Sequence, residues 1–101
     1  MARRRGHREQ HPSYAEQIDL DEGNERELAR HGVMGWEVKQ VFENGPIWAA
    51  NKRHRAGDWK MMGVTNGQRR LTIVVRYDTE TNAIRPITGW QPTDGELSRY
   101  F

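Results

Sequence analysis

The chain has 101 residues, of which 35% are hydrophobic and 30% charged, and its formal net charge is +2. This size allows one domain with a small core, in which the four Trp residues supply much of the buried area. No stretch approaches the roughly 18 apolar residues of a membrane span, and residues 1–13 contain no apolar run of a signal peptide, so we expect a cytoplasmic protein without membrane contact. Because Cys is absent and the four His are far apart, we expect neither disulfides nor a metal site, and no cofactor.

The charge is divided unevenly along the chain. Residues 14–44 contain three basic and eight acidic side chains, whereas residues 45–77 contain seven basic and one acidic. Residues 78–101 contain two basic and four acidic side chains. The positive charge of the domain is therefore concentrated in one segment, which favours a polyanionic partner such as nucleic acid.

Residues 1–13 are rich in Arg, His and Gln and almost without apolar side chains. Such a segment gains too little from burial to offset the entropy of ordering it, so we predict a disordered basic tail, followed by one domain over residues 14–101. Two interpretations of the tail stay open. It is either a flanking segment without a role or a basic arm that adds salt-dependent affinity for nucleic acid.

Two helices are predicted in the first half of the domain. The first covers residues 21–31, with acidic residues at its positive end and Gly32 as its stop. The second covers about residues 35–44, where apolar side chains recur at near-helical spacing before a Gly-Pro pair. Its aromatic residues Trp36 and Phe42 are expected in the core rather than in a binding site.

Short apolar runs separated by turn residues follow, which is typical of successive antiparallel hairpins. Four strands are predicted, at residues 47–54, 59–65, 70–77 and 83–88. Asn66-Gly67, between the second and third strands, suits the positive φ angles of a tight hairpin. Thr93 and Glu96 form a capping box that predicts a last helix running to Phe101. The predicted fold class is therefore α+β, with two N-terminal helices, a four-stranded antiparallel sheet and a C-terminal helix.

Alternation along the third predicted strand turns its apolar side chains toward the helices and leaves arginine on the other face. Arg85 falls on that face of the fourth strand, and Lys60 joins it from the second if Trp59 is buried. We therefore expect a basic surface of Lys60, Arg70, Arg76 and Arg85, with Lys52, Arg53, His54 and Arg55 crowded at the first hairpin. Such a surface suits a chain of phosphates. The alternative is that these arginines are simply the solvated side of the sheet.

The order of several short motifs from Asp19 onward carries a family resemblance. They are Asp21-Glu22-Gly23-Asn24, Arg30-His31-Gly32-Val33, Glu37-Val38 with Val41-Phe42, Gly63 and Gly67 before Leu71-Thr72-Ile73-Val74-Val75, and Ile84-Arg85-Pro86-Ile87-Thr88, with Glu96 and Tyr100 near the end. In this order and spacing the chain resembles the BrnT family of bacterial type II toxins, which are small ribonucleases with a RelE-like fold.

The resemblance implies metal-independent RNA cleavage, in which a ribose 2′-hydroxyl attacks the adjacent phosphate and basic side chains stabilise the developing charge. On this basis the catalytic residues are Lys60, Arg76, Arg85 and His54, where Arg85 matches the basic residue of the family's last strand and His54 carries protons. RNA-binding contacts are expected from Lys52, Arg53, Arg55, Arg69, Arg70 and Trp90. The implied partners are an RNA substrate and a cognate antitoxin protein, with operator DNA reached through the antitoxin.

Two positions depart from the family pattern. Where relatives have Gly-Arg in the second strand, this chain has Gly63-Val64, and where they have Ala-Arg after the last strand, it has Gly89-Trp90. Both replaced residues are expected active-site arginines, each worth roughly 1.5–3 kcal/mol as a charge-assisted hydrogen bond to phosphate. Two function classes therefore stay open: a ribonuclease toxin, and a non-catalytic regulatory module that binds nucleic acid or the antitoxin.

Overall fold

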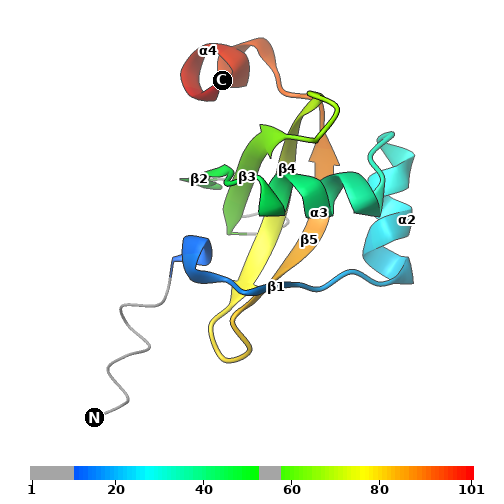
Figure 1. Cartoon of the computed structure of the whole chain (residues 1–101), viewed down its shortest axis with the longest axis vertical. Helices are drawn as coiled ribbons and strands as arrows, with labels where there is room; N and C mark the ends of the chain where they lie inside the picture. The colour runs from blue at the N-terminus through cyan, green and yellow to red at the C-terminus, as the bar shows by residue number, and fades with distance from the viewer. Residues whose placement is uncertain (1–10, 53–57) are drawn as a thin grey trace.

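The computed structural model describes residues 11–52 and 58–101. In chain order they form the short 3-10 helix η2 (Pro12–Tyr14), β1 (Gln17–Ile18), α2 (Glu22–Arg30), α3 (Gly35–Glu43), β2 (Ile47–Ala50), β3 (Trp59–Val64), β4 (Arg70–Asp78), β5 (Ala83–Trp90) and α4 (Asp94–Tyr100). Figure 1 shows α3 lying across the sheet, α2 beside it, and α4 at the end of the molecule opposite the turn between β4 and β5. The predicted α+β class is confirmed.

The sheet has five strands in the order β1-β5-β4-β3-β2. Strands β2 to β5 correspond to the four predicted strands, and the pairs β2–β3, β3–β4 and β4–β5 are all antiparallel. The two-residue strand β1 pairs parallel with β5 and makes the sheet mixed, so the prediction of a four-stranded antiparallel sheet was incomplete. Two residues are too few to show a period-2 pattern, which is why the sequence did not indicate this strand.

The helices begin and end within one residue of the predicted positions. Asp21 caps α2 by accepting a hydrogen bond from the Asn24 backbone N–H, and Gly32 follows the helix with a φ of 75°. Gly45 plays the same role after α3, with a φ of 73°. These local capping contacts need no tertiary partner, so the sequence locates them well. Among the described residues, no helix has the length and apolar character to cross a membrane.

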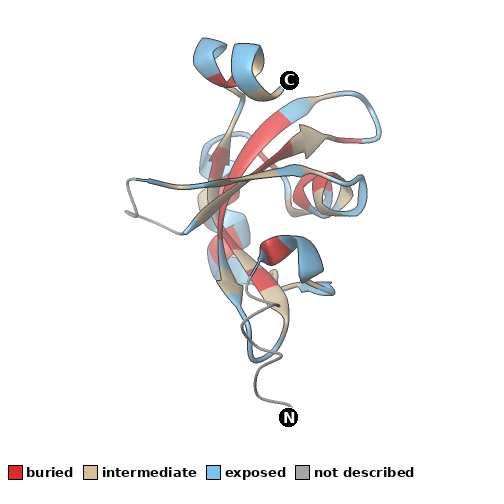
Figure 2. Cartoon of the chain, turned by 90° about the vertical axis from the view of Figure 1, so that its left-hand side faces the viewer, coloured by how far each residue is buried: buried red, intermediate tan, exposed pale blue. Residues whose placement is uncertain are grey.

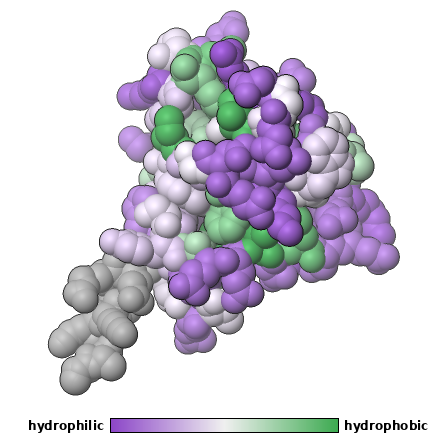
Figure 3. Space-filling view, in the orientation of Figure 1, coloured by the Kyte–Doolittle hydropathy of each residue, from purple (hydrophilic) through white to green (hydrophobic). Residues whose placement is uncertain are grey.

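The core lies between the sheet and the two helices α2 and α3, where the buried positions gather in Figure 2. Its buried members are Leu28, Val33, Val38, Val41, Met61, Leu71, Ile73, Val75 and Ile84. Phe42 packs against this cluster as expected, but the expectation for Trp36 was wrong, because its side chain is 60% exposed. Val38 faces the sheet, and two positions along a helix correspond to about 200°, so Trp36 points away. Figure 3 views the molecule from this helical side, and the surface over α2 is largely hydrophilic.

The hairpin between β3 and β4 differs from the predicted tight turn. The positive φ, 72°, occurs at Gln68 and not at Asn66 or Gly67. The Thr65 backbone N–H donates to the Arg69 carbonyl, and the Gln68 N–H donates to the Thr65 carbonyl. This is a longer hairpin loop whose last residue is left-handed, an arrangement that Asn-Gly also tolerates.

The predicted disorder of residues 1–13 does not hold for residues 11–13, and residues 1–10 lie outside the described part. Pro12 is buried at the start of η2, and the His11 side chain accepts a hydrogen bond from the Ser13 backbone N–H. The His11 ring meets the Trp59 ring edge-on, with 4.8 Å between centroids. An aromatic contact of this kind adds to burial and docks the segment on β3.

Gly89 of β5 is packed too tightly for a side chain. A Cβ placed there would lie 2.8 Å from Cδ1 of Ile73 and 3.1 Å from the Thr72 carbonyl oxygen. We therefore expect Gly89→Ala to lower the free energy of unfolding by about 1–3 kcal/mol in urea denaturation. Gly95→Ala in α4 is the matched control, because its Cβ would have no neighbour closer than 3.9 Å and Ala favours helix. Equal stability of the two variants would contradict the tight packing.

Candidate nucleic-acid interface

Lys60, Arg76 and Arg85 project from one face of the sheet. Lys60 pairs with Val74 across β3 and β4, and Arg76, two residues farther along β4, pairs with Arg85. Because side chains alternate along a strand, all three lie on the face opposite the apolar residues that pack on α2 and α3. Arg70 is on the same side of β4 and is exposed. The predicted grouping of these cations on one face is therefore present.

Arg85 is held by two carboxylates from the loop between β1 and α2. Its guanidinium lies 2.8 Å from Asp21 Oδ2 and 3.5 Å from Asp19 Oδ2. The hydrogen bond from Arg85, helped by the Asn24 backbone N–H, lowers the pKa of Asp21 to about 2. The same hydrogen bond raises the pKa of Arg85 above its ordinary value. Arg85 is thus a fixed cation with 39% of its side chain exposed.

Arg76 is exposed and has no ion-pair partner within the described ranges. It borders, with Arg85, a hollow of about 480 Å³ formed by β4, β5, the turn between them, and residues Asp19 and Asp58. Four carboxylates also line this hollow: Asp19, Asp58, Asp78 and Glu80. It therefore offers guanidinium groups that can bind phosphate beside carboxylates that can accept a proton.

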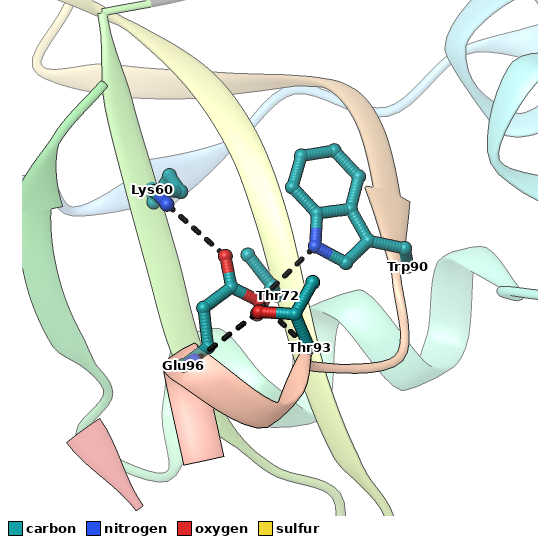
Figure 4. A network of polar contacts seen from close by, with 5 residues as sticks. All are labelled: Lys60, Thr72, Trp90, Thr93 and Glu96. Atoms are coloured by element: carbon teal, nitrogen blue, oxygen red, sulfur yellow. Dashed lines mark hydrogen bonds and ion pairs between the residues drawn. The ribbon is translucent and has the colours of Figure 1, made fainter. Parts of the chain in front are cut away.

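Lys60 takes part in a network built around Glu96 of α4, shown in Figure 4. The Lys60 ammonium lies 3.0 Å from Glu96 Oε2, while the Thr72 hydroxyl and the Trp90 indole N–H donate to Oε1 at 2.9 and 3.2 Å. The Thr93 backbone N–H adds a further bond to Oε1 at 3.1 Å. The Glu96 side chain is 9% exposed. This carboxylate therefore attaches α4 to the sheet face that carries the cations.

The pKa of Glu96 reflects opposing influences. Burial is the largest and raises it, but the hydrogen bonds from Thr93, Lys60, Thr72 and Trp90 together outweigh burial, so the pKa lies below the ordinary value of 4.5. Trp90, expected among the RNA-binding contacts, donates its indole N–H to Glu96. The sequence placed Glu96 in a helix cap and among the family motifs, but it did not predict the contacts of Glu96 with the sheet.

Arg69 and its neighbour Arg70 have different environments. Arg69 donates to both carboxylate oxygens of Glu37 in α3, at 2.7 and 2.8 Å, so it is engaged on the helical side. Arg70 pairs in register with Val64, one of the two positions where the family arginine is replaced. A guanidinium is therefore present beside that position, although it comes from the neighbouring strand.

The remaining predicted contacts belong to the β2–β3 connection. Lys52 is exposed just after β2. Arg53, Arg55 and the predicted proton carrier His54 lie outside the described residues. Over the residues that the structure covers, no three His, Cys, Asp or Glu side chains gather as a metal site would require.

Comparison with known proteins identifies no relative from which roles could be assigned to these residues. No family model, curated protein or solved structure matches the chain. The likeness to BrnT toxins consequently rests on the motifs in the sequence.

Proposed function

We propose that the protein is a ribonuclease toxin of a type II toxin–antitoxin system, as the resemblance to the BrnT family implies. The observation that supports it best is the pairing of Arg76 with Arg85 across β4 and β5, on the sheet face away from α2 and α3. Two adjacent guanidinium groups suit a phosphodiester, because each can donate parallel hydrogen bonds to its oxygens. A RelE-like sheet, a cytoplasmic setting and a cognate antitoxin that covers this face belong to the same proposal.

In the proposed reaction the ribose 2′-oxygen bonds to phosphorus and the bond from phosphorus to the 5′-oxygen breaks. The products are a 2′,3′-cyclic phosphate and a 5′-hydroxyl. Negative charge grows on the non-bridging oxygens, and Arg76 and Arg85 stabilise it. Asp21 holds Arg85 in place beforehand, so less ordering is needed when RNA binds.

The reaction also moves two protons. The 2′-hydroxyl gives its proton to a base, and the departing 5′-oxygen receives one from an acid. Carboxylates bordering the same hollow, Asp58 and Asp78, are candidates from the described residues, and His54 is the candidate from the sequence. None of these steps needs a metal ion.

A second candidate is a non-catalytic module that binds nucleic acid or an antitoxin. It is favoured by the ion pairs of Lys60, Arg69 and Arg85, since each cation is already paired with a carboxylate. An RNA phosphate would have to compete with these carboxylates for the cations. The carboxylates also weaken the positive electrostatic field that would stabilise charge developing on the phosphate. The replacement of two family arginines by Val64 and Trp90 points the same way.

Incubating the purified chain with single-stranded RNA and a metal chelator tests the proposal. We expect cleavage with cyclic phosphate ends, and growth arrest when the chain is expressed in bacteria. Arg76→Ala should reduce the cleavage rate about tenfold, the lower range for losing a charge-assisted hydrogen bond. Arg30→Ala is the control, because Arg30 lies on α2 with 72% of its side chain exposed.

Each outcome separates the two candidates. RNA binding without cleavage would support the non-catalytic module. Cleavage that Arg76→Ala leaves unchanged would remove the Arg76–Arg85 pair from the active site. A chain that neither binds nor cleaves RNA would overturn the ribonuclease proposal and would restrict the second candidate to binding DNA or an antitoxin.

A further inference from the structure

A hollow lined by basic side chains lies between the end of β2, β3 and α4. Its volume is about 250 Å³, and its lining residues are Ala50, Asn51, Lys52, Lys60, Arg99 and Tyr100. Three of the six are cations, each from a different part of the chain, and none is a carboxylate. The sequence did not indicate Arg99 as a site residue. Arg99 lies in α4, three residues after Glu96, and the alternation of side chains along the strands does not predict where a helix packs.

The position of this hollow depends on the attachment of α4 to the sheet. Glu96 bonds Lys60 at 3.0 Å, and Arg99 follows Glu96 by less than one helical turn. An adjoining hollow is lined by Lys60, Glu96, Arg99 and Tyr100 among others, so these side chains are close neighbours. The Arg99 guanidinium lies 5.9 Å from the centroid of the Tyr100 ring. The ion pair between Lys60 and Glu96 therefore also brings Arg99 close to Lys60.

The charge of the hollow is not cancelled locally. Glu96 offsets Lys60, but Lys52 and Arg99 are exposed and form no ion pair within residues 11–52 and 58–101. Two cations therefore remain for an anion, and Lys60 retains further N–H donors beyond the one given to Glu96. The volume is below the roughly 300–1,000 Å³ of pockets that enclose drug-sized ligands. A group of the size of phosphate suits it better than a whole nucleotide.

We propose that Lys52, Lys60 and Arg99 form a phosphate-binding subsite, separate from the Arg76–Arg85 pair. Lysine and arginine donors gain from a phosphate because the bonds are charge-assisted and bound counterions are released. The phosphate comes either from the backbone of single-stranded RNA or from a free phosphate compound. The RNA source rests on the function proposed above, whereas phosphate binding itself does not.

The test uses the full chain and the double variant K52Q/R99Q, with sodium pyrophosphate and a short single-stranded RNA as separate probes in calorimetry at low salt. Both substituted residues are exposed, and Lys60 is left intact so that α4 stays attached. We expect the double variant to bind each probe about tenfold more weakly. The salt dependence of RNA binding should correspond to roughly one to two fewer neutralised phosphates than in the wild type. Arg30→Gln on α2 is the matched control and should bind like the wild type. Thermal melting checks that all three proteins are folded.

Weakened binding of both probes would show a site open to any phosphate, and weakened RNA binding alone would show that the subsite takes backbone phosphates. Unchanged affinity of a folded K52Q/R99Q for both probes would overturn the subsite. RNA cleavage is measured alongside. If the chain does not cleave RNA but K52Q/R99Q still weakens pyrophosphate binding, the subsite stands while the ribonuclease proposal fails. Cleavage rates of K52Q/R99Q over a range of RNA concentrations separate kcat from KM. A lower kcat with an unchanged KM would place these residues in the reaction and would contradict a separate subsite.

Discussion

Replacing Glu96 with Ala is expected to lower the free energy of unfolding by about 3 kcal/mol, the low end for breaking a buried ion pair. The change leaves Lys60 without its carboxylate while 23% of the Lys60 side chain is exposed, and it removes the acceptor for Thr72 and Trp90. The neighbouring residues Met62 and Val74 are buried on the same sheet face and would gain access to water. Urea denaturation measures the loss, and hydrogen exchange should show faster exchange in α4.

Ser98→Ala is the matched control for this change, because Ser98 is exposed on the same helix. It should leave both stability and exchange nearly unchanged. Wild-type stability and exchange in Glu96→Ala would mean that α4 is attached by other contacts.

The pH dependence of stability gives a second readout of Glu96. Its pKa is lowered on folding, so its contribution is complete above the ordinary value of 4.5 and is lost as the pH falls through the lower pKa of the folded state. The wild type should therefore lose more stability than Glu96→Gln when the pH is taken from neutral to below 4.5. Parallel losses in the two proteins would show that other carboxylates dominate the acid unfolding.

Arg85→Ala is expected to reduce RNA cleavage about 100-fold, because removing one preorganised donor to a developing oxyanion typically has this effect. The loss should come from the reaction and not from unfolding, since the side chains of the Arg85–Asp21 ion pair are 39% and 50% exposed and water-accessible pairs add little stability. Initial cleavage rates at saturating RNA measure the effect, and thermal melting checks the fold.

Two companion variants sharpen the Arg85 result. Asp21→Asn keeps an acceptor for the cap of α2 but removes the charge that holds Arg85 in place. It should therefore lower the cleavage rate, but by less than Arg85→Ala does, because the guanidinium itself remains. Arg30→Ala removes an equivalent charge from the helical side and should have no effect. A folded Arg85→Ala that cleaves RNA at the wild-type rate would exclude Arg85 from the site.

Much of the fold could be predicted because its signals are local. The caps of α2 and α4 lie within three residues of their partners, and the strands show their faces by simple alternation. The failures arise where a residue depends on distant ones. Trp36 was expected in the core because it is aromatic. In the folded helix Val38 faces the sheet, so Trp36, two positions earlier, points to the solvent. The strand β1 exists only because its two residues meet the edge of β5.

The candidate site divides in the same way. From the sequence by itself, alternation predicted that Arg76 and Arg85 share one face, since side-chain direction in a strand is a property of the backbone. Lys60 was placed there on the condition that Trp59 is buried, and the strand register puts it on that face.

Only the tertiary structure decided which of these cations are free. The partners of Lys60 and Arg85 are 36 and 66 residues away in the chain, at Glu96 and Asp19. An ion pair depends on distance in space, which a linear count of charge cannot supply. Within residues 45–77, Lys60 and Arg69 pair with Glu96 and Glu37, whereas Lys52, Arg70 and Arg76 form no ion pair among the described residues.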